Sequence, residues 1–230
     1  VPQGGPISPI LANIYLHYVM DLWFEKRIRR HCSGSSYMVR YADDAVFCFQ
    51  YENEAKEFYQ QLIVRLKEFN LEIADEKTKI INLGKNKDDD KDSDTGSFDF
   101  LGFTHYSDKS NKGQAVIKRK TSKKKYKASL LKVKEWLKKN RHSPTKELMK
   151  ALKIKLQGYG RYYGVTNNRK SVSNFIDETK RLLFKWLNRR SQRKSFDWSR
   201  FNLFLNKYPL PRACTYVNIF EIGAGKSYIM

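Results

Sequence analysis

The chain has 230 residues, of which 40% are hydrophobic and 14% aromatic, so it is not a wholly disordered polymer and can fold into one or two domains. Its formal net charge is +21, from 45 Lys and Arg against 24 Asp and Glu. Such an excess of positive charge is self-repulsive in a compact state unless a polyanion neutralises part of it. Nucleic acid is therefore the first partner to consider. A ribosomal-type structural protein and a peripheral membrane protein remain as alternatives at this level.

The cysteines point to a reduced environment. Cys32, Cys48 and Cys214 are odd in number and widely spaced, without a CxxC pair or a His at zinc spacing. A cytoplasmic setting follows, and no membrane is expected as a partner, because no apolar run approaches the roughly 20 residues that cross a bilayer. The sequence starts at Val1 rather than Met, which predicts a fragment whose true start lies upstream.

The first elements are a helix, a hairpin and a second helix. Apolar residues at helical spacing predict a helix over 8–30, entered from a Pro- and Gly-rich loop. Runs rich in β-branched and aromatic residues at 37–41 and 45–49 predict a β-hairpin, with the polar pair Asp43-Asp44 as its turn. An apolar stripe over 55–69 predicts an amphipathic helix that packs one face on a sheet.

Two further strands are expected on either side of an insertion. Residues 80–83 and 98–104 have the composition of strands. The segment 85–97 between them is polar and rich in Asp, without apolar periodicity, so we expect a mobile surface loop.

The composition changes after Ile117, because Lys and Arg then dominate. Three helices are predicted: one with an apolar stripe from Tyr126 to Leu137, one capped by Ser143, and one capped by Ser171. The tail over 198–220 is aromatic and interrupted by prolines, and is expected to pack back as irregular chain with a short helix. The predicted fold class is α+β, with an antiparallel sheet and packed helices in residues 1–115 and a mostly helical, basic domain in residues 116–230.

The adjacent carboxylates of Asp43 and Asp44 carry the chemical signal. Like charges at a hairpin tip repel each other and raise each other's pKa unless something positive neutralises them, and a divalent metal is the usual remedy. Hard oxygen ligands of this kind suit Mg²⁺ in a two-metal phosphoryl-transfer site. A lone Asp-Asp pair is more often ordinary turn chemistry, so the surrounding motifs decide between the two interpretations.

Those motifs resemble reverse transcriptases. Tyr41-Ala42-Asp43-Asp44 between apolar strands resembles the YxDD hairpin of these enzymes. It is preceded by Pro2-Gln3-Gly4-Gly5 and Ser8-Pro9 with Leu11 and Asn13, similar to a PQG…SPxLxN element. Leu71-Glu72-Ile73, Glu76-Lys77-Thr78-Lys79 and Phe100-Leu101-Gly102-Phe103 follow and resemble the elements that close the polymerase palm. Four motifs in this order make accidental agreement improbable.

The second half narrows the resemblance to proteins encoded by group II introns. The segment Leu156-Gln157-Gly158-Tyr159-Gly160-Arg161-Tyr162-Tyr163-Gly164 resembles the GYxxYYG element of their thumb or maturase region. The resemblance implies a partial palm over 1–115 and a thumb or maturase domain over 116–230. The implied partners are a group II intron RNA, an RNA template with a DNA primer, target DNA and deoxynucleotides.

The resemblance also implies roles at the hairpin and before it. Asp43 becomes a metal ligand and Asp44 a second carboxylate that completes the catalytic site, with Mg²⁺ as cofactor. Tyr41 would lie beside the primer end. Gln3 would contact the incoming deoxynucleotide, and Gly4 would let the backbone approach closely; otherwise these two only shape the loop.

Downstream residues receive nucleotide and primer roles in the same way. Lys77 or Lys79 would stabilise the pyrophosphate leaving group, although a solvated Lys at a strand edge is the plainer interpretation. Phe100, Leu101 and Gly102 would form the primer grip, with Gly102 letting the nucleic-acid backbone come near.

Basic helices with interleaved aromatic residues suit RNA, because cations neutralise phosphates while rings stack on unpaired bases. Tyr126, Trp136 and Trp186 have the spacing of core residues instead. The residues predicted to bind RNA are Lys123, Lys124, Lys125, Arg161, Tyr162, Arg189 and Arg190.

One departure from the family pattern bears on activity. In such enzymes another metal-binding Asp lies on a palm strand before the PQG element, and the fingers also lie before it. This sequence starts after both. We therefore expect these residues alone not to polymerise. The alternatives are an RNA-binding maturase module without polymerase activity, or another bacterial reverse transcriptase of the retron, diversity-generating or CRISPR-associated type, against which the GYGRYYG segment argues.

Overall fold

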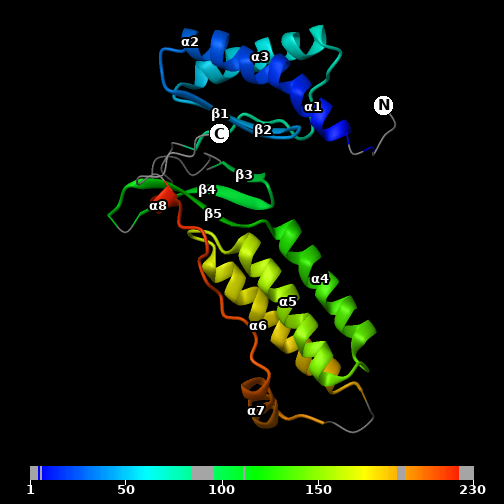
Figure 1. The fold of residues 1–230 in the computed structure, drawn as a ribbon. Helices are drawn as coiled ribbons and strands as arrows, with labels where there is room; N and C mark the ends of the chain where they lie inside the picture. Colours follow the sequence, from blue (N-terminus) through cyan, green and yellow to red (C-terminus); the bar gives the residue numbers. More distant parts are fainter. Residues whose placement is uncertain (1–4, 6, 84–95, 111, 191–194, 223–230) are drawn as a thin grey trace. The chain divides into compact units, whose positions relative to one another are not determined.

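The computed structural model describes residues 5, 7–83, 96–110, 112–190 and 195–222, and these form two compact units. The first unit is Val1–Gly96 and the second is Ser97–Met230. Helices and small antiparallel sheets occur in both (Figure 1), so the predicted α+β class is confirmed. No helix in the described part of the chain is long and apolar enough to cross a membrane.

A long helical segment opens the first unit. Helix α1 (Ser8–Leu16) has Pro9 in its first turn, which suits the fixed φ of proline. It continues through π-helical segments His17–Asp21 and Phe24–Ile28 into α2 (Arg29–His31). The predicted helix over 8–30 is confirmed, but its π-helical character is not visible in the apolar periodicity. Such segments are frequent at functional sites.

The hairpin and α3 complete the core of the first unit. Strands β1 (Ser36–Tyr41) and β2 (Asp44–Phe49) pair antiparallel, and α3 spans Glu52–Glu68, close to its predicted range. The helices cover one face of the hairpin (Figure 1). The core between them consists of Val19, Met20, Phe24, Ile28, Phe58, Leu62 and Leu66.

The prediction of a strand at 80–83 is wrong, because this segment has no strand structure. Composition favours a strand only where a residue fits a paired, half-buried surface, and Ile80 is 47% exposed. The predicted loop over 85–97 lies outside the described residues except for Gly96 and Ser97.

The second unit begins with a three-stranded antiparallel sheet. Its order is β3 (Ser97–Phe100), β4 (Phe103–Lys109) and β5 (Ala115–Thr121). The strand predicted over 98–104 is two strands joined by a tight turn. Strand β5 was not predicted, because its lysines and arginine resemble the basic helices that follow. The expected domain boundary between residues 115 and 116 falls inside this strand.

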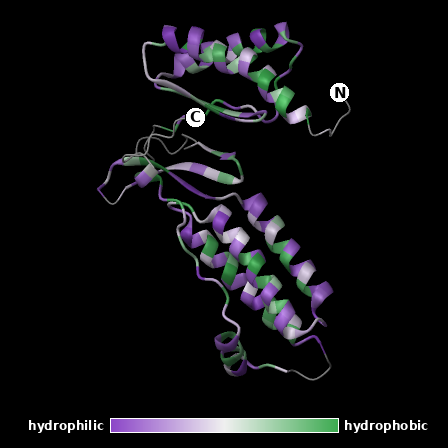
Figure 2. Ribbon diagram, viewed as in Figure 1, coloured by the Kyte–Doolittle hydropathy of each residue, from purple (hydrophilic) through white to green (hydrophobic). Residues whose placement is uncertain are grey.

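Three long helices follow the sheet in this unit (Figure 1). Helices α4 (Lys123–Asn140), α5 (Thr145–Tyr163) and α6 (Arg169–Leu187) confirm the three predicted helices and pack side by side. Figure 2 shows hydrophobic residues interleaved with hydrophilic ones along all three. Their core contains Leu137, Leu152, Leu156, Val172, Phe175, Leu183 and Leu187, and Trp186 is buried there while Tyr126 and Trp136 pack against it, as their spacing predicted.

The helix ends differ from the predicted caps. Helix α5 begins after Pro144 rather than with a Ser143 cap, and α6 begins after Asn168, three residues before Ser171. The tail forms α7 (Trp198–Lys207), where the Asp197 side chain accepts the Arg200 N–H, and α8 (Ile219–Ile222). The short tail helix is thus confirmed.

Candidate functional site

The turn between β1 and β2 carries the two predicted catalytic residues. Tyr41 pairs with Asp44, so the two-residue loop is Ala42-Asp43, and Asp44 is the first residue of β2 rather than part of the turn. Ala42 has a φ of 54°, whereas Asp43 is not among the described residues with positive φ. This sign pattern is that of a type II′ turn, whose twist matches a hairpin and which favours Gly at the first loop position.

The carboxylates of Asp43 and Asp44 are exposed and have no hydrogen-bond or ion-pair partner among the described residues. Tyr41, on the neighbouring strand, is 65% exposed. The alternation along β1 and the pairing place Tyr41 and Asp44 on the outer face of the hairpin. Two free, hard oxygen donors at a hairpin tip are a suitable donor set for Mg²⁺, so the residues present fit the metal. No group of three or more metal-binding side chains occurs in the described ranges.

An arginine that the sequence analysis missed lies directly before this turn. The Nε and Nη2 of Arg40 donate to the two carboxylate oxygens of Asp21, each at 2.6 Å. Its Nη1 donates to the Asn13 Oδ1 at 2.9 Å and to the Ala42 carbonyl at 2.8 Å. The Arg40 side chain is only 10% exposed. Sequence spacing gives no signal that these four residues meet, since the π-helical turn that ends at Asp21 sets the contact.

The ion pair makes the first unit sensitive to acid. The hydrogen bonds from Arg40 lower the pKa of Asp21, against the opposing effect of desolvation, and His17 at 3.2 Å lowers it further. A carboxyl whose pKa is lowered on folding stabilises the fold above its unfolded pKa, near 3.8, and loses that contribution as the pH falls through its folded pKa. We expect Asp21→Asn to cost about 2 kcal/mol at neutral pH and progressively less as the pH falls below about 4.

Urea unfolding at pH 7 and at pH 3, followed by NMR signals of the first unit, measures this difference. Glu72→Gln, at an exposed carboxylate with no partner in the described part of the chain, is the control. An Asp21→Asn penalty that stayed constant between the two pH values would contradict the assignment.

The predicted nucleotide contacts are distributed unevenly. Gln3 and Gly4 lie outside the described residues. Lys77 and Lys79 are exposed in an irregular segment after α3, and the Lys77 N–H donates to the Ala74 carbonyl in a turn. Lys77 and Lys79 are not on a strand, so the plainer interpretation of a solvated lysine at a strand edge does not apply to them. Their role toward a leaving group stays a prediction.

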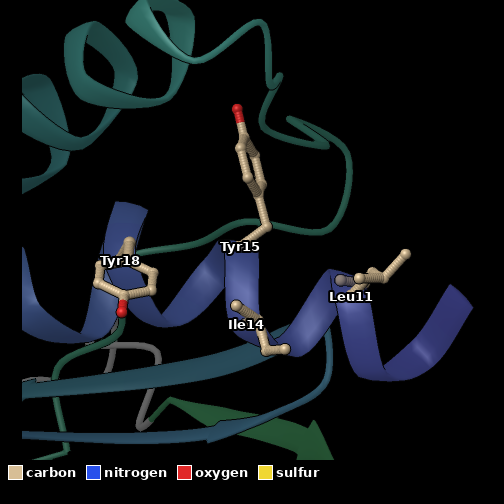
Figure 3. A pocket seen from close by; sticks show the side chains of 5 residues that line it. Leu11, Ile14, Tyr15 and Tyr18 are labelled. Carbon is tan, nitrogen blue, oxygen red and sulfur yellow. The ribbon is translucent and has the colours of Figure 1, made fainter. Parts of the chain in front are cut away.

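An open, apolar hollow lies along α1 and the start of the π-helical segment that follows it. It is lined by Leu11, Ala12, Ile14, Tyr15 and Tyr18. Figure 3 shows four of these side chains projecting from the helix, and the Tyr15 hydroxyl donates to the Phe69 carbonyl at 2.8 Å. No carboxylate lines the hollow, so it is not a metal site.

The predicted primer grip forms the tight turn between β3 and β4. Phe100 pairs with Phe103, and the loop residues Leu101 and Gly102 have φ values of 49° and 82°. Positive φ at both positions is the pattern of a type I′ turn, which the Gly suits and the Leu does not. The Tyr162 hydroxyl, at the end of α5, donates to the Leu101 carbonyl at 3.0 Å. A predicted RNA-binding residue therefore holds the predicted primer grip.

The other predicted RNA-binding residues fall into two groups. Lys123, Lys124 and Lys125 at the start of α4 are exposed, as is Arg161 on α5, and none has an ion-pair partner among the residues described. The guanidinium of Arg189 lies 5.4 Å from the centre of the Trp186 ring. Arg190 instead donates to the Thr145 hydroxyl and the Ser143 carbonyl, which fixes the start of α5.

A buried asparagine joins the sheet of the second unit to its helices. Asn168 is fully buried, accepts the Thr121 N–H at 2.8 Å, and donates to the Thr121 hydroxyl and to the Tyr163 carbonyl. Sequence analysis placed the start of α6 at Ser171 and missed this residue. Thr121 ends β5 and Tyr163 ends α5, so one amide connects three elements.

Comparisons with known proteins cover most of the chain. Residues 1–105 match the family model "Reverse transcriptase (RNA-dependent DNA polymerase)". Residues 116–204 match the model "Group II intron, maturase-specific domain". A search of the curated proteins gave no match.

Proposed function

The chain belongs to the reverse transcriptase and maturase proteins of group II introns, and on this premise we propose that its first unit carries catalytic residues of an RNA-directed DNA polymerase and its second binds intron RNA. The observation that supports the polymerase role is the free Asp43-Asp44 pair at the tip of a hairpin in the region that matches reverse transcriptases. The match to the maturase-specific model favours a group II intron protein over a retron, diversity-generating or CRISPR-associated enzyme.

We assign Asp43 and Asp44 as the residues that hold a divalent metal, which the reverse transcriptase family generally uses. Bound Mg²⁺ would lower the pKa of an attacking hydroxyl and stabilise the leaving oxygen. The chain's own contribution is to bring both carboxylates to one hairpin tip, with Tyr41 exposed beside them for a nucleic-acid end. Two carboxylates from one tip hold a metal weakly, so we expect residues 1–230 alone not to extend a primer.

The RNA-binding role rests on unpaired positive charge. Every lysine of α4 is exposed, and none of them has an ion-pair partner in the part of the chain described. Those lysines are Lys123, Lys124, Lys125, Lys127, Lys132, Lys134, Lys138 and Lys139. Free ammonium groups on one helix are suited to phosphates, because their neutralisation releases counterions. A group II intron RNA is the partner we propose, with template, primer and target DNA as ligands of the complete enzyme.

Replacing Lys123, Lys124 and Lys125 together by Ala tests this role. We expect the slope of log affinity against log salt for intron RNA to decrease by about 2, because each lost phosphate contact removes roughly 0.7. The loss of affinity should therefore be larger at low salt than at high salt. Filter binding or fluorescence anisotropy over a salt series measures both quantities.

The matched control replaces Lys26, Lys56 and Lys67, three exposed lysines of the first unit, and so makes the same change in net charge. Equal changes in slope for the two triple variants would show that only total charge matters and would remove α4 from the binding surface.

A maturase that binds RNA without polymerising is the second candidate. It is favoured by the concentration of free lysines in the second unit, whereas the described residues offer only two carboxylates at the hairpin. The two candidates share the RNA prediction. They differ in whether the complete enzyme, rather than residues 1–230 alone, extends a primer.

A further inference from the structure

We propose that Arg40 is a positioning residue for the proposed polymerase reaction: it holds the turn that carries Asp43 and Asp44 and is itself held by Asp21 and Asn13. The inference rests on the proposed function of that turn. Arg40 is not among the site residues predicted from the sequence. It is carried by four hydrogen bonds from one guanidinium.

The first step concerns the backbone at Ala42. A residue with a Cβ at a φ of 54° is strained, and such a conformation persists only where its surroundings hold it. The Arg40 Nη1 donates to the Ala42 carbonyl at 2.8 Å, directly before the peptide that leads into Asp43. A fixed carbonyl at this point fixes the direction in which the chain enters Asp43 and Asp44.

The second step concerns the anchor of Arg40. Both oxygens of Asp21 accept from Arg40 at 2.6 Å, in the bidentate geometry that only a planar guanidinium allows. Asp21 belongs to a helical segment whose neighbours Val19 and Met20 are buried in the core of the unit. The position of the turn is therefore tied to a core helix rather than to the hairpin alone.

The third step concerns charge. Arg40 lies directly before the turn, and a guanidinium without a partner there would leave a free positive charge at the base of the turn, which disfavours binding of a metal cation. Asp21 neutralises Arg40 and uses its Nε and Nη2 N–H groups, and Asn13 orients the remaining Nη1. Among the described residues, Asp43 and Asp44 have no ion pair.

Arg40→Gln, Arg40→Lys and Asn13→Ala test the proposal in a form of this protein that extends a primer, called here the polymerase-competent protein. We expect Arg40→Gln to lower kcat by about 100-fold, as a displacement near 1 Å does in other active sites, and to raise the half-saturating Mg²⁺ concentration several-fold. The KM for template and primer should remain unchanged. Arg40→Lys restores one donor and should recover about tenfold of the loss, and Asn13→Ala should show a smaller loss of the same kind.

Arg65→Gln is the control for a purely structural effect. Arg65 also donates to a backbone carbonyl of this unit, that of Val19, and stacks on Phe69, but it has no described contact with the turn. If Arg40 serves only the fold, both variants lose kcat in proportion to their lost stability, with unchanged Mg²⁺ dependence. That result would overturn the proposal, as would wild-type kcat in folded Arg40→Gln.

An arm without catalysis separates this inference from the proposed function. In the 230-residue chain, Mn²⁺ added during NMR should broaden the Asp43 and Asp44 amide signals of wild type at lower concentration than those of Arg40→Lys. Broadening that is equal in both refutes the positioning role even if the protein polymerises. A difference in broadening supports the positioning role whether or not residues 1–230 extend a primer. The polymerase assignment is refuted by a different result, namely primer extension that survives Asp43→Ala in a form of the protein that polymerises.

Discussion

Asp43→Ala is expected to lower primer extension by the polymerase-competent protein by roughly 1,000-fold, equivalent to about 4 kcal/mol of transition-state stabilisation. The physical reason is that Asp43 is one of only two free carboxylates at the tip, so its removal leaves Asp44 as a single donor at this position. Primer extension on an RNA template, as a function of Mg²⁺ concentration, measures the loss. Asp44→Ala should behave in the same way.

The same variants should bind intron RNA and assist splicing as wild type does, because the proposed RNA-binding lysines belong to the second unit. Asp75→Ala is the matched control, since Asp75 is an exposed carboxylate in a turn of the first unit with no partner in the described ranges. Polymerisation that survived in Asp43→Ala would refute the metal site. Loss of RNA binding in step with polymerisation would refute the separation of the two functions.

Asn168→Ala is expected to have the largest effect on stability, with a loss of about 3 kcal/mol and a decrease in Tm of roughly 10 °C. The side chain is fully buried and its removal leaves the Thr121 N–H without its acceptor and the Thr121 hydroxyl without its donor. A buried polar group that loses its partner costs its full desolvation free energy. Thermal and urea unfolding, followed by circular dichroism, measure the change.

Two further variants interpret the Asn168 result. Asn202→Ala, at an exposed position of α7, should change the stability by less than about 0.5 kcal/mol. Asn168→Leu fills a similar volume without any polar atom, and should be as destabilising as the alanine if hydrogen bonding rather than volume holds the site. A stable leucine variant would assign the contribution of Asn168 to packing.

The helices and the hairpin were predictable because their apolar residues repeat with the period of the structure. The stripes of α3, α4 and α6 appear in the sequence at helical spacing, and β1 and β2 are runs of β-branched and aromatic residues. The segment over 80–83 has the same kind of composition without a paired surface, and its prediction failed. Strand β5 was missed because its lysines and arginine obscure the alternation of its half-buried and exposed positions.

The polar contacts that hold the sites could not be predicted in this way. Asp43 and Asp44 belong to a contiguous motif, so they can be recognised in a single sequence. Arg40 meets Asn13 and Asp21 across 27 and 19 positions, and Asn168 meets Thr121 across 47. Such contacts depend on where tertiary packing places each element, and neither spacing nor propensity encodes that placement in a single chain.

The tip formed by Leu101 and Gly102 has a consequence for how the second unit opens. A leucine at positive φ would not choose this shape by itself, and the hydroxyl of Tyr162, 61 positions along the chain, stabilises it. Fraying at the carboxyl end of α5 thus releases the tip. The amide hydrogens of the helix end and of the tip should therefore exchange with solvent as one cooperative group. A helix of the maturase-like region and a loop assigned to the primer would then share a single local unfolding equilibrium.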